Sequence, residues 1–123
     1  MKYFPIYLDA NYINAMIIGG GEVAARKIEL LLKSTTKISI MSKTLNASVE
    51  RLVNLHQLTW LKHNYQPGHL NHYNIVIAAT DSCEVNSAVA AESNQLNILT
   101  NVVDQPELCN YITPAIIDRN PMI

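Results

Sequence analysis

The chain has 123 residues, of which 49% are hydrophobic and 15% charged, and its formal net charge is -1. These values fit one folded domain and argue against intrinsic disorder. A near-neutral chain without a basic stripe is not expected to bind nucleic acid, and no apolar run approaches the ~20 residues that span a bilayer. The two cysteines, Cys83 and Cys109, form neither a disulfide framework nor a C-x-x-C motif. We therefore expect a cytoplasmic protein that does not enter a membrane.

Strands and helices are predicted to alternate, which indicates an α/β fold with a doubly wound, Rossmann-like parallel sheet. Apolar and β-branched runs predict strands at residues 13–18, 37–41, 58–61, 75–80 and 97–103. Helical spacing of apolar residues predicts helices at 24–33 and around 45–53. A third helix should follow residue 81, with Asp81 as its N-cap and Glu84 completing a capping box.

Two other segments have a different character. Residues 62–74 are polar and contain Pro67-Gly68, so we expect a loop with at most one helical turn. Residues 108–119 have strand character but no helix follows them.

A glycine-rich turn lies between the first predicted strand and the first predicted helix. Its residues are Gly19, Gly20, Gly21, Glu22, Val23 and Ala24, which fit G-x-G-x-x-[GA]. Gly19 would permit the tight turn, Gly21 the close approach of a pyrophosphate, and Ala24 the packing of helix on strand. The backbone N–H groups of the first helical turn would bind the phosphates, so we expect residues 19–23 to contact a dinucleotide.

The second predicted strand ends without the acidic residue that usually holds the ribose hydroxyls of such a cofactor. Met41-Ser42-Lys43-Thr44 stands at that position. Ser42 or Thr44 could hydrogen-bond a ribose, and Lys43 could accept a 2′-phosphate. The residues alone therefore leave NAD and NADP both open.

Further segments lie in a characteristic order along the chain, at residues 19–27, 77–81, 85–86, 101–106 and 112–119. Two of them, N-V-V-D-x-P at 101–106 and P-A-I-I-D-R at 114–119, are much more specific than a glycine loop. With Phe4-Pro5-Ile6 near the start, these segments resemble the precorrin-2 dehydrogenase/sirohydrochlorin ferrochelatase family. That family also forms the N-terminal part of siroheme synthase.

The resemblance implies an NAD-binding domain at residues 1–112 and the start of a dimerisation and substrate segment at 113–123. Family members form homodimers and continue into a dimerisation region and a helical domain. We therefore expect this chain to be truncated before those regions, to lack most of the dimerisation segment, and to have little activity alone.

The resemblance also implies a chemistry, which is the NAD-dependent oxidation of precorrin-2 to sirohydrochlorin. Some members then insert Fe²⁺, which would be a second substrate. Asp104 is implied as the catalytic aspartate. It follows a predicted strand, where α/β sheets place their ligands, although a turn aspartate would occupy the same position. By the same resemblance Thr80 and Asp81 would contact the cofactor, and Asn101 and Arg119 the tetrapyrrole.

Several residues allow two interpretations. Arg26 and Lys27 could form a solvated helix face or part of the electropositive surround of a substrate that carries many carboxylates. His69 and His72 are three residues apart but lack further ligands, so no structural metal site is predicted. Cys109 could handle iron, although simple packing explains it as well.

Two other functions remain open from the sequence. A nucleotide-sensing module of a transport regulator would share the glycine turn and the doubly wound sheet without any chemistry. An unrelated small dehydrogenase would share them with another substrate. Neither has a reason to contain both N-V-V-D-x-P and P-A-I-I-D-R.

Overall fold

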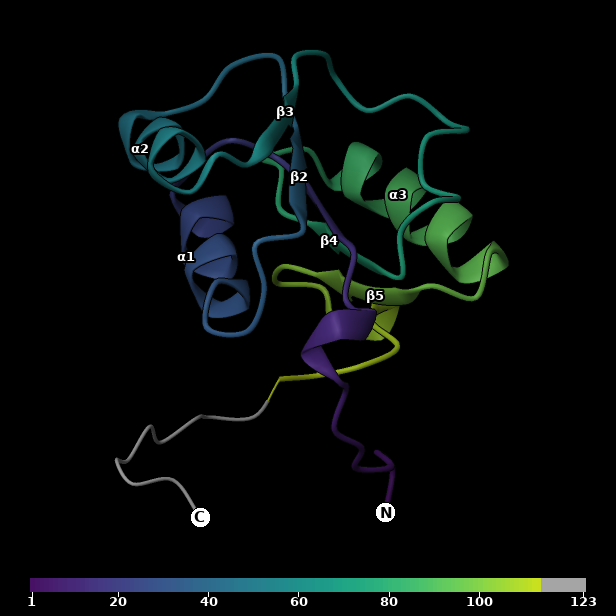
Figure 1. Ribbon diagram of the computed structural model, residues 1–123. Helices are drawn as coiled ribbons and strands as arrows, with labels where there is room; N and C mark the ends of the chain where they lie inside the picture. The colour runs from purple at the N-terminus through teal and green to yellow at the C-terminus, as the bar shows by residue number, and fades with distance from the viewer. Residues whose placement is uncertain (114–123) are drawn as a thin grey trace.

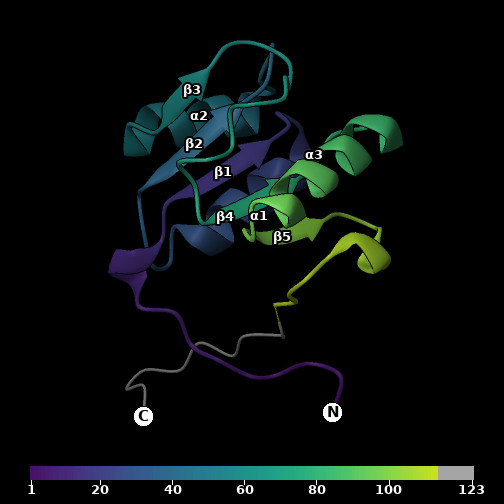
Figure 2. The same cartoon turned by 90° about the vertical axis from the view of Figure 1, so that its right-hand side faces the viewer.

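A five-stranded parallel sheet forms the centre of the molecule. The computed structural model describes residues 1–113, and its strands are β1 (Ala15–Ile18), β2 (Ile38–Met41), β3 (Thr59–Leu61), β4 (Ile75–Ala78) and β5 (Leu99–Val102). The strands lie in the order β3-β2-β1-β4-β5, and every neighbouring pair is parallel (Figure 2). The chain thus begins in the middle of the sheet and winds outward in both directions, which confirms the Rossmann-like architecture.

Helices cover both faces of this sheet. Helices α1 (Glu22–Leu31) and α2 (Ala47–His56) lie on one face, and α3 (Cys83–Gln95) lies on the other (Figure 1). Two short 3₁₀ helices, η1 (Ala10–Tyr12) and η2 (Pro106–Leu108), precede β1 and follow β5. Within residues 1–113 no helix has the length and apolar character needed to cross a membrane.

The core has two layers because side chains of each strand alternate between the faces. In β1, Ala15 and Ile17 pack with α1 and α2, whereas Met16 and Ile18 pack against the side of α3. All four are almost fully buried, and burying each large side chain contributes about 1.5–3 kcal/mol. Burial on both faces is why β1 reads as a continuous apolar run rather than an alternating one.

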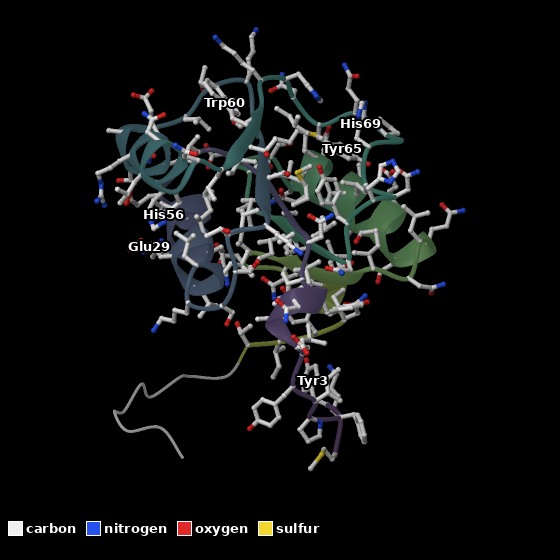
Figure 3. The ribbon with its side chains drawn as sticks, viewed as in Figure 1. Tyr3, Glu29, His56, Trp60, Tyr65 and His69 are labelled. Carbon is white, nitrogen blue, oxygen red and sulfur yellow. The ribbon has the colours of Figure 1, made fainter. Side chains whose placement is uncertain are left out.

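The connection from β3 to β4 contains no helix, as the sequence predicted for residues 62–74. Leu70 of this loop is fully buried against the face that α3 covers, and Tyr65 lies over α3 (Figure 3). Glu92 of α3 accepts hydrogen bonds from the Tyr65 hydroxyl and, at 2.9 Å, from the backbone N–H of Gly68. Burial, together with this hydrogen bond and the charge of Glu92, raises the pKa of the Tyr65 phenol.

The predicted N-cap of α3 is wrong by one residue. Ser82, not Asp81, is the cap, and its hydroxyl accepts from the backbone N–H of Val85 at 3.2 Å. Asp81 is exposed and lies before the cap, so Glu84 does not complete a capping box. The reason is the turn before the helix, where the Thr80 hydroxyl accepts from the backbone N–H of Ser82 at 3.2 Å.

The strand character expected from residue 108 onward is also wrong as far as the structure describes the chain. Residues 109–113 form no strand, although they run beside the outer edge of β5. Side chains hold them there instead. The side-chain oxygen of Asn110 accepts a hydrogen bond from the backbone N–H of Thr100 at 2.7 Å. The Cys109 sulfur accepts a hydrogen bond from the backbone N–H of Val102 at 3.2 Å. Cys109 thus has a structural role at this edge.

Candidate functional site

A cleft of about 830 Å³ lies at the carboxyl ends of the strands. The order of the sheet reverses between β1 and β4, and open α/β sheets bind their ligands outside such a switch point. The lining residues come from the turns after β1, β2, β4 and β5 and from the first turns of α1 and α3. Those predicted from the sequence and found there are Gly19, Gly20, Gly21, Glu22, Val23, Ser42, Thr44, Thr80, Asp81 and Asp104.

The three consecutive glycines meet three different constraints. Gly19 has a φ of 133°, and a Cβ there would lie 2.3 Å from the carbonyl oxygen of Ala79. A Cβ at Gly20 would lie 2.3 Å from the carbonyl oxygen of Thr44. A Cβ at Gly21 would meet no atom within 4 Å. Gly19 and Gly20 are therefore required by the protein itself, and only Gly21 has open space beside it.

The turn after β2 forms one end of the cleft. Ser42 and Thr44 line it, and the Ser42 hydroxyl donates to the Thr44 carbonyl at 2.7 Å. The indole N–H of Trp60 in β3 donates to the Ser42 carbonyl at 2.8 Å and holds the turn in place. Lys43, predicted as a cofactor contact, is exposed and is not part of the cleft wall.

The turn after β4 is held by Asn86, a residue to which the sequence gave no role. Asn86 is 3% exposed and lies in the second turn of α3. The side-chain oxygen of Asn86 accepts a hydrogen bond from the Thr80 hydroxyl at 2.7 Å. The side-chain amide of Asn86 donates a hydrogen bond to the Thr80 backbone carbonyl at 3.1 Å. The sequence signal for it was its place in the segment 85–86 that belongs to the resemblance, which does not by itself give the residue a role. The sequence also gave no role to Asn46, which is the N-cap of α2. The backbone N–H of Asn46 donates a hydrogen bond to the Gly20 carbonyl at 2.8 Å.

We predict that Asn86→Ala loosens this wall of the cleft. The substitution removes the Asn86 partners of the half-buried Thr80 backbone N–H and carbonyl, at 3.2 and 3.1 Å, while the Thr80 hydroxyl keeps its bonds to Ser82; we expect a cost of about 1–3 kcal/mol. The unfolding midpoint in urea should fall and the dissociation constant for NAD⁺ should rise. The control Asn94→Ala removes an amide that only bonds Asn110 and the Ala90 carbonyl of its own helix, and it should leave NAD⁺ binding unchanged. Equal effects of the two substitutions would show that Asn86 has no special role at the cleft.

Asp104 lies in the turn after β5, where the cleft meets a second hollow of about 560 Å³. It is exposed and has a φ of 59°, a conformation that Asp and Asn adopt more readily than most residues. Val23, Val103 and Gln105 also line both spaces. The side-chain oxygen of Gln105 is buried and has no hydrogen-bond partner within residues 1–113. Asp104 and Gln105 thus lie between two neighbouring spaces and line both.

Asn101 lines the second hollow and not the cleft. Its amide donates to the carbonyl of Tyr111 at 3.5 Å, and burial, with a smaller effect of Cys109, raises the pKa of the Tyr111 phenol. Arg119, predicted together with Asn101 as a substrate contact, lies outside the described residues.

The two spaces differ in charge. The charged residues that line the cleft are Glu22, Asp81 and Asp104, all acidic. The second hollow is lined by Arg26 and Lys27 as well as Asp104. Within residues 1–113 no three His, Cys, Asp or Glu side chains gather in a way that could hold a metal ion.

The cleft fits a dinucleotide. Gly21 is the N-cap of α1 and offers no side-chain hydrogen bond, so the free N–H groups of the first turn remain available to a phosphate. The space beside Gly21 allows that phosphate to approach the backbone. Gln105, whose side-chain oxygen is buried without a hydrogen-bond partner within residues 1–113, also lines the cleft.

Comparisons with known proteins agree with this geometry. The chain is 41% identical over 123 residues to a siroheme synthase of Pseudoalteromonas atlantica and 43% identical over 126 residues to one of Nitrosomonas eutropha. It covers only 27% and 26% of these two proteins, so it spans about a quarter of their length. Among solved structures, SirC, a precorrin-2 dehydrogenase, has the same fold, with a TM-score of 0.78 at 21% identity over 98% of this chain and 59% of that one.

A family described as "Putative NAD(P)-binding" matches residues 6–115, which include the glycine turn, all five strands and Asp104. Because that match covers most of the sequence, the chain belongs to this NAD(P)-binding family.

Proposed function

We propose that the chain is the NAD-binding part of an enzyme that oxidises precorrin-2 to sirohydrochlorin in siroheme synthesis. The observation that carries this proposal is the position of Asp104 at the junction of the dinucleotide cleft and the second hollow. A base at that point would touch a substrate and a cofactor at once. The two siroheme synthases, and the name precorrin-2 dehydrogenase of the similar structure, support this choice of substrate.

In the proposed site, residues 19–23 bind the pyrophosphate, and Ser42 and Thr44 hydrogen-bond the adenosine ribose. Thr80 and Asp81 border the middle of the cofactor. We propose NAD rather than NADP because no cation lines the cleft to receive a 2′-phosphate. Lys43 is not proposed as a contact, since its side chain stays outside the cleft wall. Glu22, Asp81 and Asp104 would also repel a further negative charge.

NAD⁺ supplies an acceptor for the two electrons and one proton that leave the substrate together as a hydride. The Asp104 carboxylate takes the second proton that the oxidation releases, as a general base does. Asn101 lines the hollow in which the tetrapyrrole would lie and offers it an amide.

We further propose that residues 1–112 form the cofactor domain and that the dimerisation segment begins at residue 113. Insertion of Fe²⁺, with iron as a substrate, would then be an activity of the longer protein. Asp104 could also receive the pyrrole protons that iron replaces.

The test is NADH formation, followed by absorbance, with precorrin-2 as substrate in a protein that carries this chain at the length of the siroheme synthases. NAD⁺ should support turnover, and NADP⁺ should support it about tenfold less well or worse. A second arm with added Fe²⁺ reports iron insertion. Cofactor binding without any oxidation of precorrin-2 would contradict the proposed enzyme and favour a nucleotide sensor.

A further inference from the structure

The second hollow is a built site with its own chemistry. Its lining comes from α1, the end of β5, the start of η2 and residues 109–113, and it shares Val23, Val103, Asp104 and Gln105 with the cofactor cleft. A ligand here would therefore lie against the cofactor, not at a remote point of the surface. Its volume of about 560 Å³ is that of a small-molecule site.

Two adjacent cations of α1 face this hollow. Arg26 and Lys27 both line it, and Asp104 is the single acidic residue that does so. Within residues 1–113 neither cation has an ion-pair partner in the protein. Lys27 is half-buried, which is uncommon for a lysine that has no partner. From the sequence a solvated helix face was the favoured interpretation of these two residues, but the structure places both in the lining of the second hollow.

The cleft and the hollow therefore offer different charged side chains to a ligand. Apart from the backbone N–H groups of the glycine turn, the cleft presents only acidic charged side chains to a molecule with several carboxylates. Such a molecule would be attracted to the hollow, where the cations outnumber the carboxylate. Arginine binds a carboxylate through two parallel hydrogen bonds and so fixes its orientation, whereas lysine acts as a point charge.

We propose that Arg26 and Lys27 bind carboxylate side chains of the tetrapyrrole substrate and hold its macrocycle in the second hollow, against Asp104. This inference rests on the proposed function and assigns the substrate anchors of the same site. It makes Arg26 and Lys27, in the middle of α1, determinants of substrate affinity and leaves cofactor binding to the glycine turn at the N-terminus of the same helix.

The test uses uroporphyrin, a stable tetrapyrrole with acetate and propionate side chains, as a probe of the 123-residue chain. Binding is measured from the porphyrin fluorescence at several salt concentrations, with and without NAD⁺. Arg26→Gln with Lys27→Gln should raise the dissociation constant for uroporphyrin about a hundredfold, because each lost charged contact is worth about a factor of ten. NAD⁺ binding, measured separately, should change less than about twofold.

A matched control separates specific contacts from overall charge. Arg51 lies on the exposed side of α2 and Lys37 precedes β2, and both are outside the hollow. Arg51→Gln with Lys37→Gln removes the same charge and should leave uroporphyrin binding within about threefold of the unmodified chain, which is the change expected from long-range electrostatics. Thermal unfolding of both double variants checks that each is folded.

The outcomes separate this inference from the proposed function. Equal weakening by the two double variants, or uroporphyrin binding that neither affects, would overturn the assignment of Arg26 and Lys27. Failure of uroporphyrin to bind the unmodified chain would also overturn it. None of these results affects NADH formation from precorrin-2, which tests the proposed function by itself.

Discussion

Replacing Gly20 by alanine is expected to destabilise the domain even in the absence of any cofactor. The added methyl group would lie 2.3 Å from the Thr44 carbonyl oxygen and 2.9 Å from the Ser42 hydroxyl oxygen. The Thr44 backbone and the Ser42 side chain would have to move, and the hydrogen bond from the Asn46 N–H to the Gly20 carbonyl at 2.8 Å would be strained. Overpacking of this kind costs about 1–3 kcal/mol. Urea unfolding followed by the fluorescence of Trp60, the only tryptophan, measures the loss.

Gly21→Ala is the matched control because it adds the same methyl group one residue further on. No atom lies within 4 Å of that position, and Gly21 has an ordinary φ of -102°. Stability should therefore change by less than about 1 kcal/mol, the cost of a poorer N-cap. NAD⁺ binding should nevertheless weaken about tenfold or more, since the methyl group occupies the space where the pyrophosphate would approach. Unchanged NAD⁺ affinity in Gly21→Ala would remove the pyrophosphate from this turn.

Asp104→Asn is expected to lower NADH formation from precorrin-2 by at least about a hundredfold, the usual contribution of a general base. The amide has the shape of the carboxylate but cannot take the proton. Asn also adopts the φ of 59° found at this position, so the turn should keep its form. Stability and NAD⁺ affinity should therefore remain close to those of the unmodified protein.

Glu107→Gln is the control for Asp104→Asn. Glu107 is exposed in η2, three residues beyond Asp104, and lines neither the cleft nor the second hollow. Its substitution removes the same charge from the same turn and should leave turnover unchanged. If Asp104→Asn kept its turnover in the same assay, Asp104 could not be the essential base.

The architecture of the sheet was predictable because it depends on local patterns. The apolar runs of β1 and β4 require burial on both faces, and the glycine turn that follows β1 fixes its position beside a helix. The polar, proline-containing segment 62–74 correctly predicted a crossover without a helix. What the pattern could not show is that Leu70 of this segment fills the core in place of a helix, because a single apolar residue in a polar loop has no periodicity.

The site was less predictable because its details depend on contacts between distant residues. The motif G-x-G-x-x-[GA] allows any residue at the position of Gly20. The carbonyl of Thr44, 24 residues further along the chain, nevertheless leaves no room for a side chain at Gly20. The role of Asn86 depends on the turn at Thr80. The spacing of apolar residues predicts that Arg26 and Lys27 belong to a helix. It does not show that they line a hollow together with the end of β5.

The bonds that Cys109 and Asn110 make with β5 protect the protein from intermolecular strand addition. An edge strand normally presents free N–H and C=O groups on which another chain can align, and this can begin aggregation. Here the outward N–H groups of Thr100 and Val102 are taken by side chains, and the Thr100 carbonyl accepts from the Asn110 N–H at 3.0 Å. Within residues 1–113, the side chains thus cover the outer edge of β5 without adding a further strand.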